Sequence, residues 1–269
     1  MGKYYAGLDI GSTTSKCVII NENEEILTYK IIDTLFDREK SGEIVFGMGL
    51  EEAGLKKEDI TYIVSTGYGR RSLSFTDDVV PEIIAHGKGT IKLYPGTRTI
   101  IDIGGQDSKV ISIDENGIID KFEMNDKCAA GSGRFFEVLT ERLLSIPMEE
   151  LSPLSLKATS PVTISAMCTI FAESEIISLL SSGTSSADIA MGMNLSIAKR
   201  IIAMGKTGQI RFTEPIVFSG GVAQNKGTTK AFSDLLKKEV IAVENPQNTA
   251  ALGAALVAKE RYKKLNDKE

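Results

Sequence analysis

The sequence predicts an α/β protein built from two related lobes, each with a mixed β-sheet. Two observations lead to this fold class. Predicted strands and helices alternate along the chain, and one glycine-containing segment occurs twice. A length of 269 residues suits one large domain or two modest ones. Hydrophobic content of 42% and charged content of 25% are ordinary for a globular protein and argue against disorder or a fibrous repeat.

The repeat organises the chain. Residues 9–23 read DIGSTTSKCVIINEN and residues 102–116 read DIGGQDSKVISIDEN, so Asp, Ile, Gly, Ser, Lys, Glu and Asn recur in matching places without a gap. An apolar run precedes each turn of glycine and small polar residues, and a second apolar run follows it. A further turn and a third strand come next, so each copy predicts a β-hairpin that leads into a meander. Two copies of one unit predict two related lobes, with the chemistry between them.

The other elements follow from apolar periodicity and from turn residues. In the first lobe we expect strands at 5–10, 17–20 and 60–65 and helices at 44–53 and 79–93. In the second lobe we expect strands at 99–103, 110–113, 215–218 and 239–243 and helices at 133–144, 169–180, 188–203, 229–238 and 249–265. Because Pro95-Gly96 breaks the chain, residues 1–95 are assigned to the first lobe and 96–269 to the second. The alanine-rich final helix, 249–265, is able to pack back on the first lobe.

Composition excludes several classes of function. Lys and Arg total 31 against 36 Asp and Glu, and the net charge of −5 argues against a nucleic-acid partner. Three cysteines do not make a secreted disulfide framework. A single histidine excludes multi-histidine zinc sites. No run approaches the roughly 20 apolar residues of a membrane span, and Asp9 interrupts the start, so we expect a cytoplasmic protein without a membrane partner.

The two hairpin turns have the residues of a phosphate site. Asp9 and Asp102 end apolar strands, where a carboxylate can hold a hydrated Mg²⁺. Glycine lets the backbone approach phosphate, and the following N–H groups and hydroxyls can donate to its oxygens. Lys16 and Lys109 add positive charge. One such loop is usually only a turn, whereas two matched copies can hold a phosphate tail and its metal from both sides. A third glycine element, 218–225, could accept a nucleoside, although by itself it is more simply a tight turn.

Together these elements resemble the nucleotide motifs of the actin, Hsp70 and sugar-kinase superfamily. The resemblance implies two ribonuclease-H-like lobes, with ATP or ADP and Mg²⁺ bound in the cleft between them. Asp9 and Asp102 would organise the metal and its waters. Gln106 would orient the attacking water, with Glu175 a more remote candidate. The residues implied to contact phosphate or nucleoside are Gly11, Ser12, Thr13, Thr14, Lys16, Gly104, Gly105, Gln106, Asp107, Lys109, Gly220, Gly221 and Gln224.

The sequence predicts one structural cysteine and one pair of functional cysteines. Cys17 lies in an apolar β-run and is expected to be a buried core thiol. Cys128 and Cys168 each stand just before a predicted helix, whose N-terminus stabilises a bound thiolate. Either one alone would be an ordinary thiol, but their shared placement favours ligation or redox chemistry. Two cysteines fill half of a cubane cluster's four thiolate positions, and a twofold dimer supplies four. A tetrahedral zinc site would also be filled by these four thiolates.

Two segments narrow the resemblance further. Residues 127–135 (KCAAGSGRF) and 168–175 (CTIFAESE) resemble the two cluster motifs of the 2-hydroxyacyl-CoA dehydratase activators, and 65–70 (STGYGR) also agrees. That family, the BadF/BadG/BcrA/BcrD type, includes ATPase subunits of benzoyl-CoA reductase. The resemblance implies a homodimer bridged by one [4Fe-4S] cluster on Cys128 and Cys168. It also implies ATP-driven transfer of one electron to a partner iron–sulfur dehydratase or reductase, with ferredoxin or flavodoxin as the electron source.

Two other functions remain open. A small-molecule kinase of the same superfamily, acting on an amino sugar, would need a catalytic carboxylate beside a sugar pocket and no paired cysteines. A non-enzymatic, nucleotide-gated switch would bind ATP without a cluster. The lone histidine, His86, lies on a predicted helix and is expected to be structural.

Overall fold

The first repeat forms the middle of a five-stranded mixed sheet. The structure is a computed structural model that describes residues 2–165 and 168–267. The strands lie in the order β3-β2-β1-β4-β5, and β1 pairs antiparallel with β2 but parallel with β4. The elements of this unit are β1 (Tyr4–Ile10), β2 (Thr14–Asn21), β3 (Ile26–Asp33), α1 (Arg38–Ala53), β4 (Ile60–Thr66), β5 (Asp78–Val79), α2 (Glu82–Leu93) and α8 (Thr249–Asn266), with short 3₁₀ turns at Lys57–Asp59 and Pro246–Asn248.

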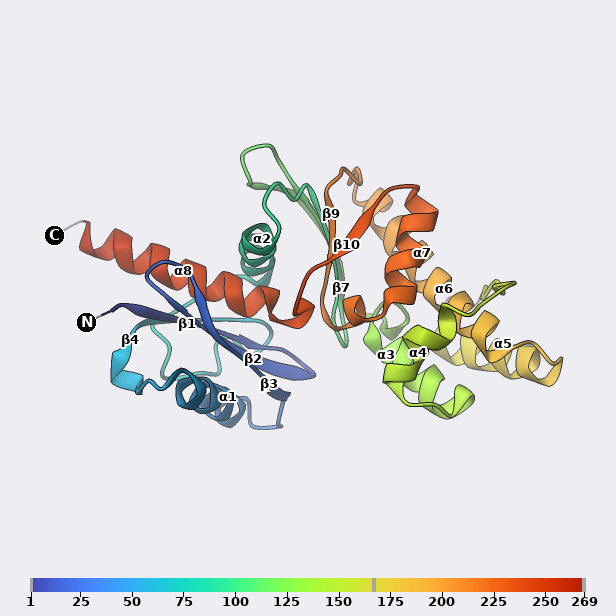
Figure 1. The fold of residues 1–269 in the computed structure, drawn as a ribbon, viewed down its shortest axis with the longest axis horizontal. Helices are drawn as coiled ribbons and strands as arrows, with labels where there is room; N and C mark the ends of the chain where they lie inside the picture. Colours follow the sequence, from blue (N-terminus) through green and yellow to red (C-terminus); the bar gives the residue numbers. More distant parts are fainter. Residues whose placement is uncertain (1, 166–167, 268–269) are drawn as a thin grey trace. The chain divides into compact units, whose positions relative to one another are not determined.

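Alternation along the strands fills one core on each face of this sheet. Cys17 and Ile19 lie in a cluster with α1, whereas Val18 lies in the cluster that contains α8. Successive side chains of a strand point to opposite faces, which explains the division. Helix α8 lies along β1 in Figure 1. It also approaches α2 closely, because a Cβ built on Gly253 would lie 1.8 Å from the carbonyl oxygen of Ala85.

The second repeat forms the middle of a second five-stranded sheet with the same plan. The strands lie in the order β10-β9-β6-β7-β8, and β6 pairs antiparallel with β7 but parallel with β9. Asp9 faces Lys16 in the first hairpin, and Asp102 faces Lys109 in the second. The repeated sequence therefore gives the same strand register twice. The elements of this unit are β6 (Thr99–Ile103), β7 (Ser108–Ile113), β8 (Ile119–Asn125), α3 (Gly133–Leu139), α4 (Met148–Ser155), α5 (Thr169–Ser181), α6 (Ser186–Thr207), β9 (Ile216–Ser219), α7 (Lys226–Leu236) and β10 (Val240–Ala242).

The chain divides into two units (Figure 1). Met1–Pro95 and Gln247–Glu269 make the first, and Gly96–Pro246 makes the second. The sequence predicted that the second lobe begins at residue 96 and comprises residues 96–269. In the structure α8 belongs to the first unit and not to the second. Its alanines and glycine pack on β1 and α2, as the sequence had allowed for this helix.

Two expected helices differ from the structure, and one helix was missed. The helix expected at 79–93 begins only at Glu82, because Asp78–Val79 extends the sheet as β5 and Pro81 precedes the first turn. The helix expected at 133–144 is α3 followed by a π-helical turn at Thr140–Leu144. Helix α4 was not expected at all, and it contains Pro153 within its span.

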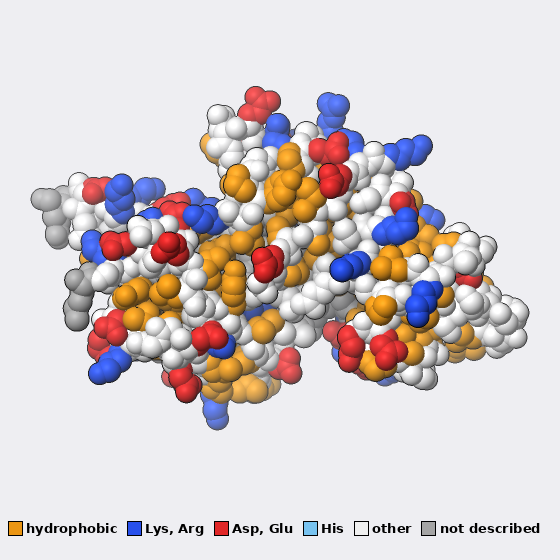
Figure 2. Space-filling view, in the orientation of Figure 1, with side chains coloured by type: hydrophobic (Ala, Val, Ile, Leu, Met, Phe, Trp, Pro, Cys, Tyr) orange, Lys and Arg blue, Asp and Glu red, His pale blue; other side chains and the backbone are white. Residues whose placement is uncertain are grey.

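No helix in the described part of the chain combines the length and the apolarity that a membrane crossing needs. Figure 2 shows acidic and basic side chains interspersed over the face that it draws. This surface agrees with the small net charge of −5.

Candidate functional site

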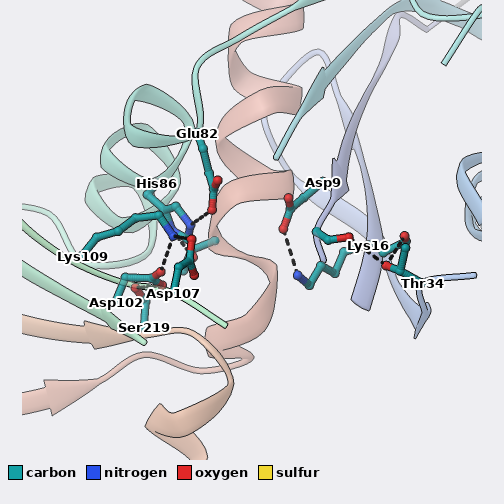
Figure 3. A network of polar contacts seen from close by, with 12 residues as sticks. Asp9, Lys16, Thr34, Glu82, His86, Asp102, Asp107, Lys109 and Ser219 are labelled. Atoms are coloured by element: carbon teal, nitrogen blue, oxygen red, sulfur yellow. Dashed lines mark hydrogen bonds and ion pairs between the residues drawn. The ribbon is translucent and has the colours of Figure 1, made fainter. Parts of the chain in front are cut away.

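The first hairpin places a buried carboxylate at the end of β1. Asp9 is 4% exposed, and its Oδ2 accepts a hydrogen bond from Lys16 Nζ at 2.9 Å (Figure 3). Its Oδ1 is buried and has no hydrogen-bond partner among the described residues. A buried oxygen without a partner is costly unless a ligand, water or metal satisfies it. This oxygen therefore fits the Mg²⁺ site that the sequence predicts.

The turn of this hairpin is tight and open to ligand. Gly11 N donates to Thr14 O at 3.1 Å, which leaves the side chains of the intervening residues at the surface. A hollow of about 810 Å³ lies beside the turn, lined by Ser12, residues 34–39 and Ser72. The predicted phosphate contacts of the first unit are Gly11, Ser12, Thr13, Thr14 and Lys16.

Gly67, to which the sequence assigned no role, lies against the Asp9 carboxylate. Gly67 follows β4, the strand parallel to β1, and has φ of +84°. A Cβ there would lie 2.4 Å from Asp9 Oδ1 and 2.7 Å from Ile10 O. Glycine is thus required both by the backbone conformation and by the carboxylate. The signal was present in the sequence, since STGYGR follows a strand at the edge where neighbouring parallel strands also end.

The second hairpin holds its carboxylates in a buried network. Lys109 Nζ lies 2.7 Å from Asp107 Oδ2 and 3.3 Å from Asp102 Oδ2, and Lys109 is only 1% exposed (Figure 3). Ser219 Oγ donates to Asp102 Oδ1 at 2.8 Å. Ser219 was not assigned as a site residue, although it opens the predicted glycine element. A buried lysine is stable here because two carboxylates surround it.

The glycine element after β9 lies directly against the end of β6. Gly220 has φ of +83°, and a Cβ there would lie 2.3 Å from Ile103 O. The backbone of this element therefore passes within contact distance of the strand that carries Asp102. Among the other predicted residues of this unit, Gln106 and Gln224 are exposed, and Gly104, Gly105 and Gly221 are partly exposed.

The three cysteines have different surroundings. Cys17 is fully buried, and burial raises the pKa of its thiol, as expected for a core residue. Cys168 is partly exposed and is the N-cap residue of α5. Cys128 is exposed, and the Asn125 side chain both accepts from its N–H at 3.2 Å and donates to its carbonyl at 2.8 Å. Helix α3 begins at Gly133, as expected, and a 3₁₀ turn at Ala129–Gly131, which was not expected, lies between Cys128 and this helix.

The two accessible cysteines share an electrostatic neighbour. Burial lowers the pKa of the Arg200 guanidinium, and Cys128 and Cys168 both act in the opposite direction. The described residues contain no group of three or more histidines, cysteines or acidic residues that could hold a metal ion alone. This pair fits half of a four-thiolate donor set, which a second copy would complete.

The second hairpin is hydrogen-bonded to the cysteine segment. Gly133 N donates to Gly104 O at 2.8 Å, and Arg134 N donates to Gly105 O at 2.9 Å. These two donors belong to the first turn of α3, five and six residues after Cys128. The predicted phosphate loop is therefore linked directly to the backbone that follows Cys128.

His86 contacts two side chains of the first unit. It is buried on α2, with Nδ1 3.1 Å from Thr249 Oγ1 and Nε2 3.4 Å from Glu82 Oε1. These contacts tie α2 to the start of α8 and agree with a structural histidine.

Known proteins resemble the chain over nearly its whole length. A sequence model described as the BadF/BadG/BcrA/BcrD ATPase family matches residues 6–258. The activator of lactoyl-CoA dehydratase from Anaerotignum propionicum is 45% identical over 97% of this chain and 99% of its own.

Two solved structures are similar in both sequence and fold. The activator of the 2-hydroxyisocaproyl-CoA dehydratase from Clostridium difficile, with bound ADPNP, is 41% identical and has a TM-score of 0.92, covering 99% of this chain and 98% of its own. Component A of the (R)-2-hydroxyglutaryl-CoA dehydratase of Acidaminococcus fermentans is 40% identical with a TM-score of 0.92, covering 97% of this chain and 99% of its own. The predicted fold class, of the actin, Hsp70 and sugar-kinase type, is confirmed, and so is the predicted family resemblance.

Proposed function

Because the chain belongs to the BadF/BadG/BcrA/BcrD ATPase family, we propose that it is an ATP-dependent activator that donates one low-potential electron to a partner iron–sulfur dehydratase or reductase. The names of its relatives support an activator role, and the bound ADPNP of one relative supports nucleotide binding. The electron would come from ferredoxin or flavodoxin. The acceptor's substrate class would be a 2-hydroxyacyl-CoA or an aromatic acyl-CoA.

The two hairpins would bind Mg²⁺ and the phosphates of ATP. Asp9 offers a buried oxygen without a partner, and Asp102 lies in the equivalent register of the second hairpin. Lys16 and Lys109 lie beside these carboxylates, where they would also neutralise phosphate oxygens. Water attacks the γ-phosphorus and the bond to the β–γ bridging oxygen breaks, so that ATP and water give ADP and phosphate. Positioning and charge neutralisation supply most of the catalysis in such reactions, and exposed Gln106 would orient the water.

Cys128 and Cys168 from two copies of the chain would hold the [4Fe-4S] cluster. Cys128 is exposed and Cys168 is partly exposed, and Arg200 donates to the backbone two residues after Cys128. When bound, the cluster would serve as the carrier of the one electron that the acceptor gains. The N-cap position of Cys168 places the free N–H groups of α5 near its thiolate.

The hydrogen bonds from Gly133 and Arg134 to the second phosphate loop carry the proposal. A phosphate bound at Gly104 and Gly105 would shift the first turn of α3, and the shift would reach Cys128 through the 3₁₀ turn that joins them. Binding energy from ATP is thereby converted into a change around the cysteine that bears the electron carrier.

Anaerobic purification followed by iron, sulfide and EPR analysis tests this function. We expect the wild type to carry iron and sulfide in equal amounts. The double variant Cys128→Ser/Cys168→Ser should lose both, whereas Cys17→Ala, which removes a buried core thiol, should keep them. Iron that persists in the double variant would contradict the proposal. A wild type that converts ATP to ADP only by transferring the γ-phosphoryl group to an amino sugar would favour a kinase. ATP binding without iron would favour a nucleotide-gated switch.

A further inference from the structure

Arg200 is held beside the cysteine segment by two contacts. It lies on α6, and its Nη1 donates to Ala130 O at 2.6 Å, within the 3₁₀ turn that follows Cys128. Its Cζ lies 5.3 Å from the centroid of the Phe135 ring, which is fully buried. A hydrogen bond and a cation–π contact therefore fix the guanidinium in a partly buried position.

The same guanidinium is within electrostatic reach of both accessible cysteines. Burial lowers the pKa of Arg200, and negative charge on Cys128 and on Cys168 acts in the opposite direction. Arginine nevertheless keeps its proton in proteins. The hydrogen bond to Ala130 O thus holds a permanent positive charge beside the backbone two residues after Cys128, and Cys168 also acts on this charge from the N-terminus of α5.

We propose that Arg200 is a positioning residue that sets the reduction potential of the cluster bound by Cys128 and Cys168. This inference rests on the proposed function. Adding one electron makes a thiolate-bound cluster more negative, so a fixed cation nearby stabilises the reduced form and raises the potential. In a homodimer two copies of Arg200 would act on one cluster. The fixed guanidinium also holds the backbone at Ala130, which keeps the separation between charge and ligand constant.

Three variants separate charge from geometry. Arg200→Gln removes the charge but keeps an amide that can donate to Ala130 O. Arg200→Lys keeps the charge and loses the planar guanidinium. Lys199→Gln is the matched control, because it removes the same charge from the neighbouring, exposed residue of α6.

The test is a potentiometric titration of the anaerobically reconstituted homodimer, with titanium(III) citrate as the reductant and EPR of the reduced cluster as the readout. Iron content is measured on each sample. For Arg200→Gln we expect the equilibrium constant of the one-electron reduction to fall at least about tenfold, which is a shift of about 59 mV to more negative potential. Arg200→Lys and Lys199→Gln should stay within about threefold of the wild type, which is a small part of that shift.

The outcomes distinguish the inference from the function on which it rests. Arg200→Gln with full iron and the wild-type potential would overturn the role of Arg200 and leave the proposed function standing. If Arg200→Gln binds no cluster, the test falls to Arg200→Lys. A cluster with full iron and the wild-type potential in Arg200→Lys supports the role of the charge. A lost cluster, or a potential shifted by about tenfold in the equilibrium constant, overturns it. A wild type without iron would overturn the proposed function and this inference together.

Discussion

Replacing Gly67 by alanine should damage the nucleotide site through Asp9. The new Cβ would lie 2.4 Å from Asp9 Oδ1, about 1 Å closer than an ordinary contact, so the carboxylate must move. The positive φ of 84° adds roughly 1–2 kcal/mol of backbone strain. Steric overlap in a packed site adds about 1–3 kcal/mol. We therefore expect a loss of about 2–5 kcal/mol in the free energy of unfolding.

The chain contains a matched control for this substitution. Gly54, the residue after α1, also has a positive φ, of 65°, but nothing lies within 4 Å of its Cβ position. Gly54→Ala should therefore cost only the strain of roughly 1–2 kcal/mol and leave ATP hydrolysis unchanged. Displacing Asp9 by about 1 Å should lower the ATPase rate of Gly67→Ala by about 10- to 100-fold. Urea unfolding and phosphate release measure the two effects. Equal behaviour of the two variants in both assays would refute the role of Gly67 at Asp9.

Four further predictions concern other parts of the molecule. Lys109→Met should lower the free energy of unfolding by about 3–5 kcal/mol, because it leaves Asp102 and Asp107 buried without their cation. Urea unfolding measures this loss, and the double variant Lys109→Met/Asp107→Asn should recover part of it. A double variant no more stable than Lys109→Met would contradict this reason. Gly253→Ala should unfold several degrees below the wild type in calorimetry, since its Cβ would overlap the α2 backbone, and an unchanged Tm would show that α8 does not need this approach. Gly133→Ala, whose Cβ would lie 3.1 Å from Gly104 O, should weaken the effect of nucleotide on the cluster EPR signal more than it weakens nucleotide binding; equal losses would argue against coupling through α3. Hydrogen bonds from Lys259 and Lys92 lower the pKa of Glu24, so the stabilising effect of its carboxylate is present at neutral pH and is lost as pH falls below about 4. The difference in free energy of unfolding between wild type and Glu24→Gln should therefore shrink between pH 7 and pH 3. A difference that stays constant would contradict this prediction.

Much of the fold follows from local pattern. The two DIG segments specify a tight hairpin after an apolar strand, and hairpin register depends mainly on the turn and on alternating burial. Asp9 and Asp102 therefore occupy equivalent positions in both sheets. Cys17 could be assigned to the core for the same reason, because it alternates with neighbours that pack on the opposite face.

What sequence could not provide are contacts between distant segments. Arg200 lies in an ordinary amphipathic helix pattern, and only the packing of α6 brings it to Ala130. Ser219 and Gly67 gain their importance because their strands lie beside β6 and β1. The 3₁₀ turn after Cys128 was missed because KCAAGSG contains both small helix formers and glycines, and the hydrogen bonds to Gly104 and Gly105 decide where α3 begins.

The most direct test of the account is the EPR spectrum of the dithionite-reduced protein with and without Mg·ADPNP. Bound nucleotide should change the spectrum of the wild type, because the second phosphate loop is hydrogen-bonded to the segment that follows Cys128. Nucleotide that is demonstrably bound and leaves the spectrum of an intact cluster unchanged would contradict the coupling of ATP to electron donation.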